Sequence, residues 1–212
     1  AYHYWGKNFL SRLNGMWAFA IYDKSKNEIF LSRDRYGIKP LYFCKIGKEF
    51  LFASEIKAIL PLINKRYVSK EEIIRFLIYG AQEHRKETMF CDIKRFPKSS
   101  YAIFDLETNI IEFHKFYEMD IVSCTINNVD LNIEKTVDLL NQSVKYRLRS
   151  DVEVGMALSG GVDSNIIVLI ANRLNKKIKA FTATYNNSKG LNEDYLTDKT
   201  ISRLDLEHFY KK

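Results

Sequence analysis

A short loop at residues 159–164 carries the side chains best suited to chemistry in this chain of 212 residues. The loop has the sequence Ser-Gly-Gly-Val-Asp-Ser and stands between two apolar runs, the second of which has helical character. Consecutive glycines have no Cβ, so this backbone can take positive φ angles and approach a ligand closely. The N–H groups and dipole of a helix start, together with the hydroxyls of Ser159 and Ser164, suit an anion. The pattern therefore predicts a phosphate-binding loop between a strand and a helix.

This loop differs from the most common nucleotide-binding loop. It lacks the spacing G-x-x-x-x-G-K-S/T and has no lysine that could reach a β- or γ-phosphate. It resembles instead the pyrophosphate loop of the ATP pyrophosphatases, which cleave ATP between the α- and β-phosphates and transfer AMP to an acceptor oxygen. The simpler alternative is a Gly-Gly turn in an ordinary βα unit, needed for steric reasons alone. Six matching residues between a strand and a helix favour the pyrophosphate loop.

The elements around this loop alternate between strand and helix. Apolar runs predict strands over 152–158 and 178–185, and helical patterns cover 133–149 and 193–204. The first of these helices carries one apolar stripe, which indicates packing and is formed by Ile133, Val137, Leu140, Val144 and Leu148. Alternation at this spacing predicts a doubly wound parallel sheet that binds ligands at the carboxyl ends of its strands.

The first half of the chain is rich in β signals instead. A helix with a capping-box start is predicted from Ser69 to Gly80. Alternating apolar residues and turn residues predict strands over 16–23, 28–33, 40–43 and 50–54, followed by a hairpin of 99–105 and 110–117. Together these elements predict an α+β domain built on an antiparallel meander.

Four segments of this half resemble known families: Leu13–Asp23, Ser32–Tyr42, Phe52–Ala58 and Met89–Pro97. The first three are similar to the later part of a class II glutamine amidotransferase domain. The fourth is similar to the segment that follows in asparagine synthases. With the pyrophosphate loop, the order of parts resembles that of the glutamine-hydrolysing asparagine synthases over nearly the whole chain.

The resemblance implies two partial domains. Residues 1–118 would be the C-terminal part of the amidotransferase domain, an α+β N-terminal-nucleophile hydrolase with αββα layers. Residues 119–132 would be a linker, and residues 133–212 would be the N-terminal part of an α/β ATP-binding domain with a doubly wound parallel sheet. The chain starts without Met, so we expect an internal fragment that lacks parts of both active sites and is inactive in isolation.

The resemblance also implies a reaction. ATP and Mg²⁺ would convert aspartate to asparagine through β-aspartyl-AMP, with ammonia supplied directly or by glutamine hydrolysis. Ala183 would meet adenine through its backbone, although the family more often has Val at this position. Asp163 would either orient Mg²⁺ or cap the following helix, and both roles remain open. The implied ATP-binding residues are Leu158, Ser159, Gly160, Gly161, Val162, Asp163, Ser164 and Ala183.

No glutaminase residue can be assigned in this chain. The family uses an N-terminal Cys whose α-amine acts as the base, and we expect that Cys and the residues that hold glutamine to precede Ala1. Ala1 is not that nucleophile, and Cys44, Cys91 and Cys124 do not match its position. Cys44 follows an alternating aromatic strand and is expected in the core.

The cluster Arg33-Asp34-Arg35 offers charged groups beside a glycine turn. It could provide electrostatics for a substrate or a tunnel wall. Internal ion pairs that lock the turn between Gly37 and Pro40 are the favoured interpretation, because clustered opposite charges usually satisfy one another.

Composition narrows the possible partners. The net charge is +7, but the basic residues are dispersed among acidic ones, so no nucleic-acid partner is predicted. Scattered cysteines predict neither a zinc site nor a disulfide framework and favour a reducing cytoplasm. No apolar run is long enough for a membrane span. A homodimer is compatible with the sequence, which does not determine the oligomeric state.

Three alternatives remain open. A related ligase could use the same architecture with another carboxylate acceptor, in β-lactam formation or sugar amidation. An RNA-modifying pyrophosphatase would share the loop, but the amidotransferase-like first half argues against it. A non-catalytic module could retain only nucleotide binding.

Overall fold

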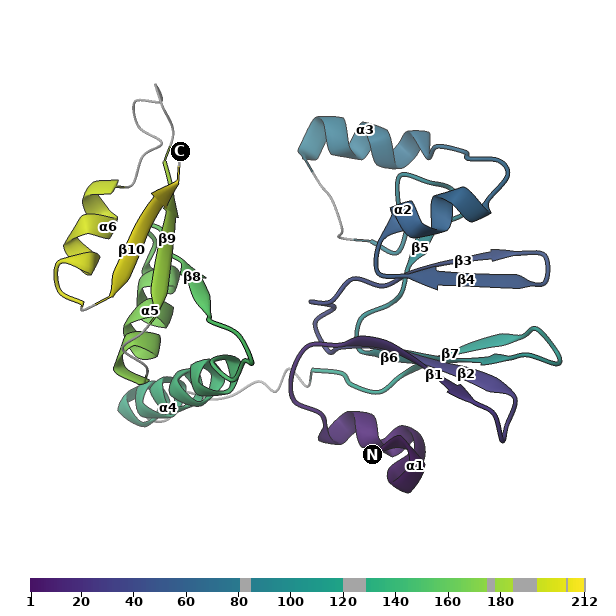
Figure 1. Cartoon of the computed structure of the whole chain (residues 1–212), viewed down its shortest axis with the longest axis horizontal. Helices are drawn as coiled ribbons and strands as arrows, with labels where there is room; N and C mark the ends of the chain where they lie inside the picture. The colour runs from purple at the N-terminus through teal and green to yellow at the C-terminus, as the bar shows by residue number, and fades with distance from the viewer. Residues whose placement is uncertain (81–84, 120–128, 175–177, 185–193, 205, 212) are drawn as a thin grey trace. The chain divides into compact units, whose positions relative to one another are not determined.

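The computed structural model describes residues 1–80, 85–119, 129–174, 178–184, 194–204 and 206–211. The chain divides into two compact units, Ala1–Val122 and Ser123–Lys212. Figure 1 shows two layered sheets with flanking helices in the first unit and one sheet with helices in the second. The fold therefore mixes helices with several sheets, as the sequence predicts.

The first sheet of the N-terminal unit is antiparallel and has the strand order β1-β2-β6-β7. Its strands are β1 (Ala18–Asp23), β2 (Glu28–Arg33), β6 (Ser100–Asp105) and β7 (Ile111–Lys115). Both predicted hairpins of this sheet are found, but the prediction of a meander is wrong. β2 pairs with β6, with Leu31 opposite Ala102, because the turn after β2 directs the chain into a second sheet.

The second sheet packs face to face on the first. Its strand order is β4-β3-β5, from β3 (Tyr42–Ile46), β4 (Glu49–Ala53) and β5 (Lys94–Arg95). One buried cluster joins Leu31 and Ala102 of the first sheet to Phe43 of the second, with Phe96 beside them. Alternate side chains of a strand point to opposite faces, so each sheet keeps a second apolar face for its helices.

Helical segments cover those outer faces. They are α1 (Tyr2–Trp5), the 3-10 segment Gly6–Arg12, α2 (Ile56–Ile59) and the 3-10 segment Leu60–Leu62. Phe9 packs against Phe30 of the first sheet, and Ile59 packs against Tyr42 of the second. The layers of this unit therefore run helix, sheet, sheet, helix (Figure 1).

The longest helix of this unit, α3 (Lys70–Tyr79), begins and ends at the predicted residues. The Glu72 N–H donates to Ser69 Oγ over 3.4 Å at its start. Gly80 follows its last residue in a left-handed conformation with φ +61°. These are the preferred residues at the two ends of a helix.

We expect Gly37→Ala to destabilise this unit more than Gly47→Ala. Gly37 has φ +68°, and a Cβ there would lie 3.1 Å from Lys98 Cβ and 3.2 Å from Arg33 Cζ. Gly47 has φ +58° and open space, so its substitution costs only backbone strain, about 1 kcal/mol. Crowding should add roughly 1–3 kcal/mol at Gly37. Urea unfolding followed by tryptophan fluorescence measures both costs, and equal values would contradict the crowding.

The C-terminal unit has a parallel sheet with the strand order β10-β9-β8. The strands β8 (Gly155–Ala157), β9 (Lys179–Ala183) and β10 (Glu207–Lys211) alternate with α4 (Val129–Arg147), α5 (Val162–Leu174) and α6 (Asp194–Ile201). This alternation agrees with the sequence-based prediction. α4 begins four residues before the predicted start at Ile133 and lies partly in the range predicted as a linker, of which residues 120–128 lie outside the described residues.

In the described residues, the helices pack on one face of this sheet. Met156 and Leu158 lie on that face, while Phe181 and Phe209 of the other face are 44% and 40% exposed. Only the Val144 and Leu148 end of the predicted stripe on α4 packs against this core. The second helical layer of a doubly wound sheet stays a prediction. None of the described helices has the length and apolar character that a bilayer span requires.

Candidate functional site

The predicted phosphate loop is held in shape by the hydroxyls of Ser159 and Ser164. Their Oγ atoms lie 2.9 Å apart. The Ser159 N–H donates to Ser164 Oγ over 3.2 Å, and the Gly161 N–H donates to Ser159 Oγ over 3.3 Å. Ser164 Oγ also lies 3.0 Å from the carbonyl oxygen of Gly161. The structure thus brings together the two hydroxyls that the sequence predicts at an anion site.

Asn165 also fixes this loop and was not among the residues predicted from the sequence. Its Nδ2 donates to the carbonyl oxygens of Ser159 (2.9 Å) and Gly161 (2.7 Å). Its Oδ1 accepts from the hydroxyl of Thr200 on α6. An Asn side chain in the first turn of a helix can reach back to loop carbonyls, so its place directly after Ser164 was the available signal.

Gly161 does not use the left-handed backbone that its type allows. Its φ lies outside the left-handed region, and a Cβ would lie 3.4 Å from Ser159 Oγ, an ordinary contact. The expected positive φ is therefore not found at Gly161. No contact in the described residues therefore requires a glycine at this position.

The carboxyl ends of β8 and β9 position the start of the loop. The Leu158 N–H donates to the Phe181 carbonyl over 2.9 Å, and Thr182 Oγ1 donates to the Leu158 carbonyl over 2.8 Å. Thr182 Oγ1 also lies 2.9 Å from Nε2 of His208 on β10. A hydroxyl has one hydrogen, so His208 should donate here through Nε2. Burial lowers the pKa of His208, against an opposing effect of Asp198, and this favours the neutral imidazole.

We expect Thr182→Val to make the loop at 158–164 less rigid, because it removes a hydroxyl while nearly keeping the side-chain volume. The Leu158 carbonyl would lose its hydroxyl donor in a buried place, at a cost of about 1–3 kcal/mol. Hydrogen exchange of peptides covering 158–164 should accelerate. Thr108→Val, at an exposed turn of the other unit, is the matched control and should leave that exchange unchanged. Equal exchange in both variants would contradict a positioning role for Thr182.

Two predicted site residues are exposed at this edge of the sheet. Ala183 ends β9, beside the strand that leads into the loop. Asp163 lies in the first turn of α5, and its carboxylate makes no hydrogen bond with the described residues, so the capping role is not found. No group of three His, Cys, Asp or Glu side chains that could hold a metal occurs within the described ranges. A Mg²⁺ site at Asp163 stays a prediction.

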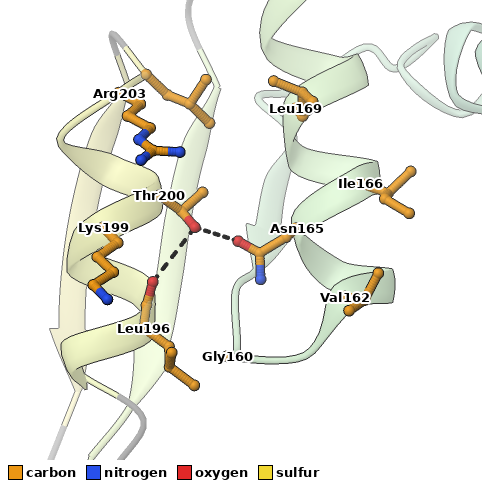
Figure 2. Close-up of a pocket in the computed structure, with 10 residues that line it drawn as sticks. Gly160, Val162, Asn165, Ile166, Leu169, Leu196, Lys199, Thr200 and Arg203 are labelled. Carbon is orange, nitrogen blue, oxygen red and sulfur yellow. Dashed lines mark hydrogen bonds between the residues drawn. The ribbon is translucent and has the colours of Figure 1, made fainter.

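A cavity of about 430 Å³ opens beside the loop, between α5 and α6. Gly160 and Val162 of the predicted site contribute to its wall. Figure 2 shows the hydrogen bond between the two helices, with Lys199 and Arg203 on the α6 side. Its volume and its two cationic side chains would accept part of an anionic small molecule.

In the N-terminal unit, the Arg33-Asp34-Arg35 cluster locks the turn after β2. Asp34 is fully buried and accepts backbone hydrogen bonds, at 3.0–3.3 Å, from Trp17, Tyr36, Ile38 and Lys39. Arg33 and Arg35 donate to backbone carbonyls. The predicted locking of the turn is confirmed. The predicted ion pairs among these three side chains are not found, because backbone groups satisfy them instead.

These donors also set the ionisation of Asp34. Burial alone would raise the pKa of this carboxyl group. The backbone N–H groups outweigh burial and hold the pKa of Asp34 below its ordinary value, because each donates to the ionised form. Asp34 is therefore a structural anion.

Nothing around the two cysteines in the described residues supports a nucleophile at either one. Cys44 is fully buried in β3, as predicted, and burial raises the pKa of its thiol. Cys91 is exposed and lies outside the strands and helices. No glutaminase residue is therefore assigned.

Comparison with protein families identifies the larger part of the chain. Residues 1–117 match the family model of a glutamine amidotransferase domain. The chain belongs to the glutamine amidotransferase family. Residues 135–211 match the family model of asparagine synthase. All of the predicted ATP-binding residues lie within the second match.

Curated relatives resemble this chain over most of its length. A putative glutamine-hydrolyzing asparagine synthetase 2 of Methanocaldococcus jannaschii is 37% identical over 79% of the chain and 33% of the relative. Glutamine-hydrolyzing asparagine synthetase 1 of Bacillus subtilis is 28% identical over 99% of the chain and 33% of the relative. Asparagine synthetase 2 of the same organism is 35% identical over 78% of the chain and 24% of the relative. The chain thus spans about a third or less of their length.

Among solved structures, glutamine phosphoribosylpyrophosphate amidotransferase from B. subtilis aligns with 81% of this chain and 33% of its own. The TM-score is 0.34 and the identity is 18%, a similarity too low to decide the fold.

Proposed function

We propose that this protein acts as a glutamine-hydrolysing asparagine synthase, in which ATP drives the conversion of aspartate to asparagine. One observation carries the proposal: a strand, the Ser-Gly-Gly-Val-Asp-Ser loop and a helix follow an amidotransferase unit and lie in a segment that matches asparagine synthase. The relatives named asparagine synthetase span both segments.

The proposed reaction has two steps. An oxygen of the aspartate β-carboxylate attacks the α-phosphorus of ATP, the bond to the bridging oxygen breaks, and pyrophosphate leaves. Ammonia then attacks the acyl carbon of β-aspartyl-AMP, loses a proton and displaces AMP. Negative charge grows on the leaving pyrophosphate in the first step, so donors that face it lower the barrier.

The chain's own groups fit this task. The hydroxyls of Ser159 and Ser164 and the N–H groups at the start of α5 would bind the phosphates. The backbones of Leu158 and Ala183, at the ends of adjacent strands, would meet the adenine. Mg²⁺ usually keeps several waters and binds phosphates with one or two carboxylates, so the single exposed carboxylate of Asp163 fits it. When bound, the metal would neutralise phosphate charge.

The amidotransferase unit would supply the ammonia. Its two sheets and outer helical segments agree with an αββα N-terminal-nucleophile hydrolase domain. The nucleophile and the residues that hold glutamine would lie outside residues 1–212. We therefore assign the glutaminase activity to the full-length protein only.

Pyrophosphate release by the full-length protein tests the proposal. Mg-ATP is supplied with aspartate and with either glutamine or ammonia, and asparagine is measured alongside pyrophosphate. Release that requires aspartate and yields asparagine in equal amount is expected. Release that requires a different carboxylic acid would identify another acceptor. Release with no acid would reject the ligase.

A further inference from the structure

The N-terminal unit contains a second cavity, of about 400 Å³, that the proposed function does not use. It lies where the turn after β2, the segment after α3, and β5 with its following residues come together. Five of its lining residues are cationic and none is acidic: Arg33, Arg85, Lys86, Arg95 and Lys98. Such a concentration of one charge differs from the dispersed pattern of the chain as a whole.

Carboxylates neutralise only part of this charge. Arg85 pairs with Glu71 at 3.1 Å and with Glu72 and Glu87 at 3.6 Å. Lys86, Arg95 and Lys98 have no carboxylate within ion-pair distance among the described residues. Like charges repel when brought together, so these three favour a bound anion.

One of the cationic side chains, Arg33, is held in place by hydrogen bonds, and a second, Lys86, contacts aromatic rings. Arg33 donates from Nε, Nη1 and Nη2 to three backbone carbonyls at 2.7–2.8 Å. Lys86 lies over the rings of Phe43 and Phe113, at 5.6 and 5.4 Å from their centroids. Fixed donors lose little freedom on binding, which favours affinity for a matching ligand.

Arg95 is also fixed by the chain around it. Its Nη1 donates to the carbonyls of Arg85 and Glu87, at 2.9 and 2.7 Å. Its Nε is buried and has no hydrogen-bond partner in the described residues. Because that nitrogen is closed to solvent, Arg95 contributes its positive charge to the cavity wall and not a free Nε donor.

We propose that this cavity binds a compact phosphate-bearing anion, at a site separate from the loop at 158–164. Guanidinium and ammonium groups that line one cavity suit the charged oxygens of a phosphate. The volume accepts pyrophosphate or a nucleoside monophosphate. Both ligands carry the phosphate group that the cavity would recognise, and the experiment distinguishes them.

Calorimetric titration of the full-length protein with pyrophosphate, inorganic phosphate and AMP tests the site. The pocket variant is Lys86→Gln with Lys98→Gln. The control variant is Lys24→Gln with Lys48→Gln, which removes the same charge from exposed positions of the same unit. The 158–164 loop is intact in all three proteins, so any binding there contributes equally.

The pocket variant should bind the preferred anion about tenfold more weakly or worse, while the control keeps the affinity of the unmodified protein. A loss of affinity between the control and the pocket variant that is larger for AMP would assign a nucleotide, and a loss that is larger for pyrophosphate would assign free pyrophosphate. Equal affinities in both variants, with equal thermal midpoints, would overturn the site. If the double variant does not fold, Lys98→Gln alone, at an exposed side chain, gives the same comparison.

Discussion

Gly161→Ala is expected to weaken ATP binding by the full-length protein about tenfold or more while nearly preserving its stability. The φ of Gly161 is not left-handed, and the new Cβ would make only an ordinary contact with Ser159 Oγ. Replacing the glycine that precedes α5 should lower the free energy of unfolding by at most about 1 kcal/mol. A phosphate at the loop would meet the added methyl group, so the loss should fall on the ligand. Titration with ATP and a thermal melt measure the two effects.

Gly155→Ala is the matched control, because it is expected to lower stability and to leave ATP affinity nearly unchanged. A Cβ at Gly155 would lie 2.7 Å from the ring of Phe181, which stacks on Phe209. Displacing that ring should cost about 1 kcal/mol or more of stability. ATP affinity measured well below the melting temperature should change little. A loss of stability without a loss of affinity in Gly161→Ala would contradict a phosphate at this loop.

Asp34→Ala is expected to destabilise the amidotransferase unit by about 3–5 kcal/mol. Four backbone N–H groups would lose their acceptor in a place where Asp34 itself is fully buried. Both tryptophans of the chain, Trp5 and Trp17, lie in this unit, so their fluorescence during urea unfolding reports its stability. Asp105→Ala is the control, since this carboxylate accepts two backbone N–H groups at an exposed turn, and it should cost about 1 kcal/mol.

The pH dependence of stability should also report the hydrogen bonds to Asp34. The pKa of Asp34 is lower in the folded chain than its ordinary value of 3.8. Its ionised form therefore adds stability above that ordinary value, and the contribution falls as the pH drops toward the folded pKa. Asp34→Asn should flatten the acid limb of stability against pH below the ordinary pKa of 3.8. An unchanged limb would mean that other carboxylates determine it.

The sequence predicted the elements whose signals are local. Both hairpins of the first sheet, the α3 helix with its cap at Ser69, and the alternation around the phosphate loop all follow from periodicity and turn residues. Periodicity alone predicted one meander, and the two sheet layers of the first unit were expected only from the family resemblance, because the separation depends on which strands pair. β2 pairs with β6 across a long stretch of chain, and no local signal encodes that choice.

The sequence likewise predicted some residues of the candidate site and not others. Ser159 and Ser164 could be predicted from a short motif, and the structure brings them together. Thr182 and His208 support the loop only because three parallel strands place them side by side. Thr200 reaches Asn165 only through the packing of α6 near α5. Contacts of this kind arise from tertiary structure, so they could not be predicted from the residue types alone.

The most direct test of the account follows an oxygen atom. The full-length protein is supplied with Mg-ATP, ammonia and aspartate that carries heavy oxygen in its β-carboxylate, and the AMP and asparagine are weighed by mass spectrometry. Attack of the carboxylate on the α-phosphorus predicts one heavy oxygen in AMP and the other in asparagine. Heavy oxygen in inorganic phosphate with ADP as the nucleotide product, or AMP that carries none, would contradict the proposed role of the loop.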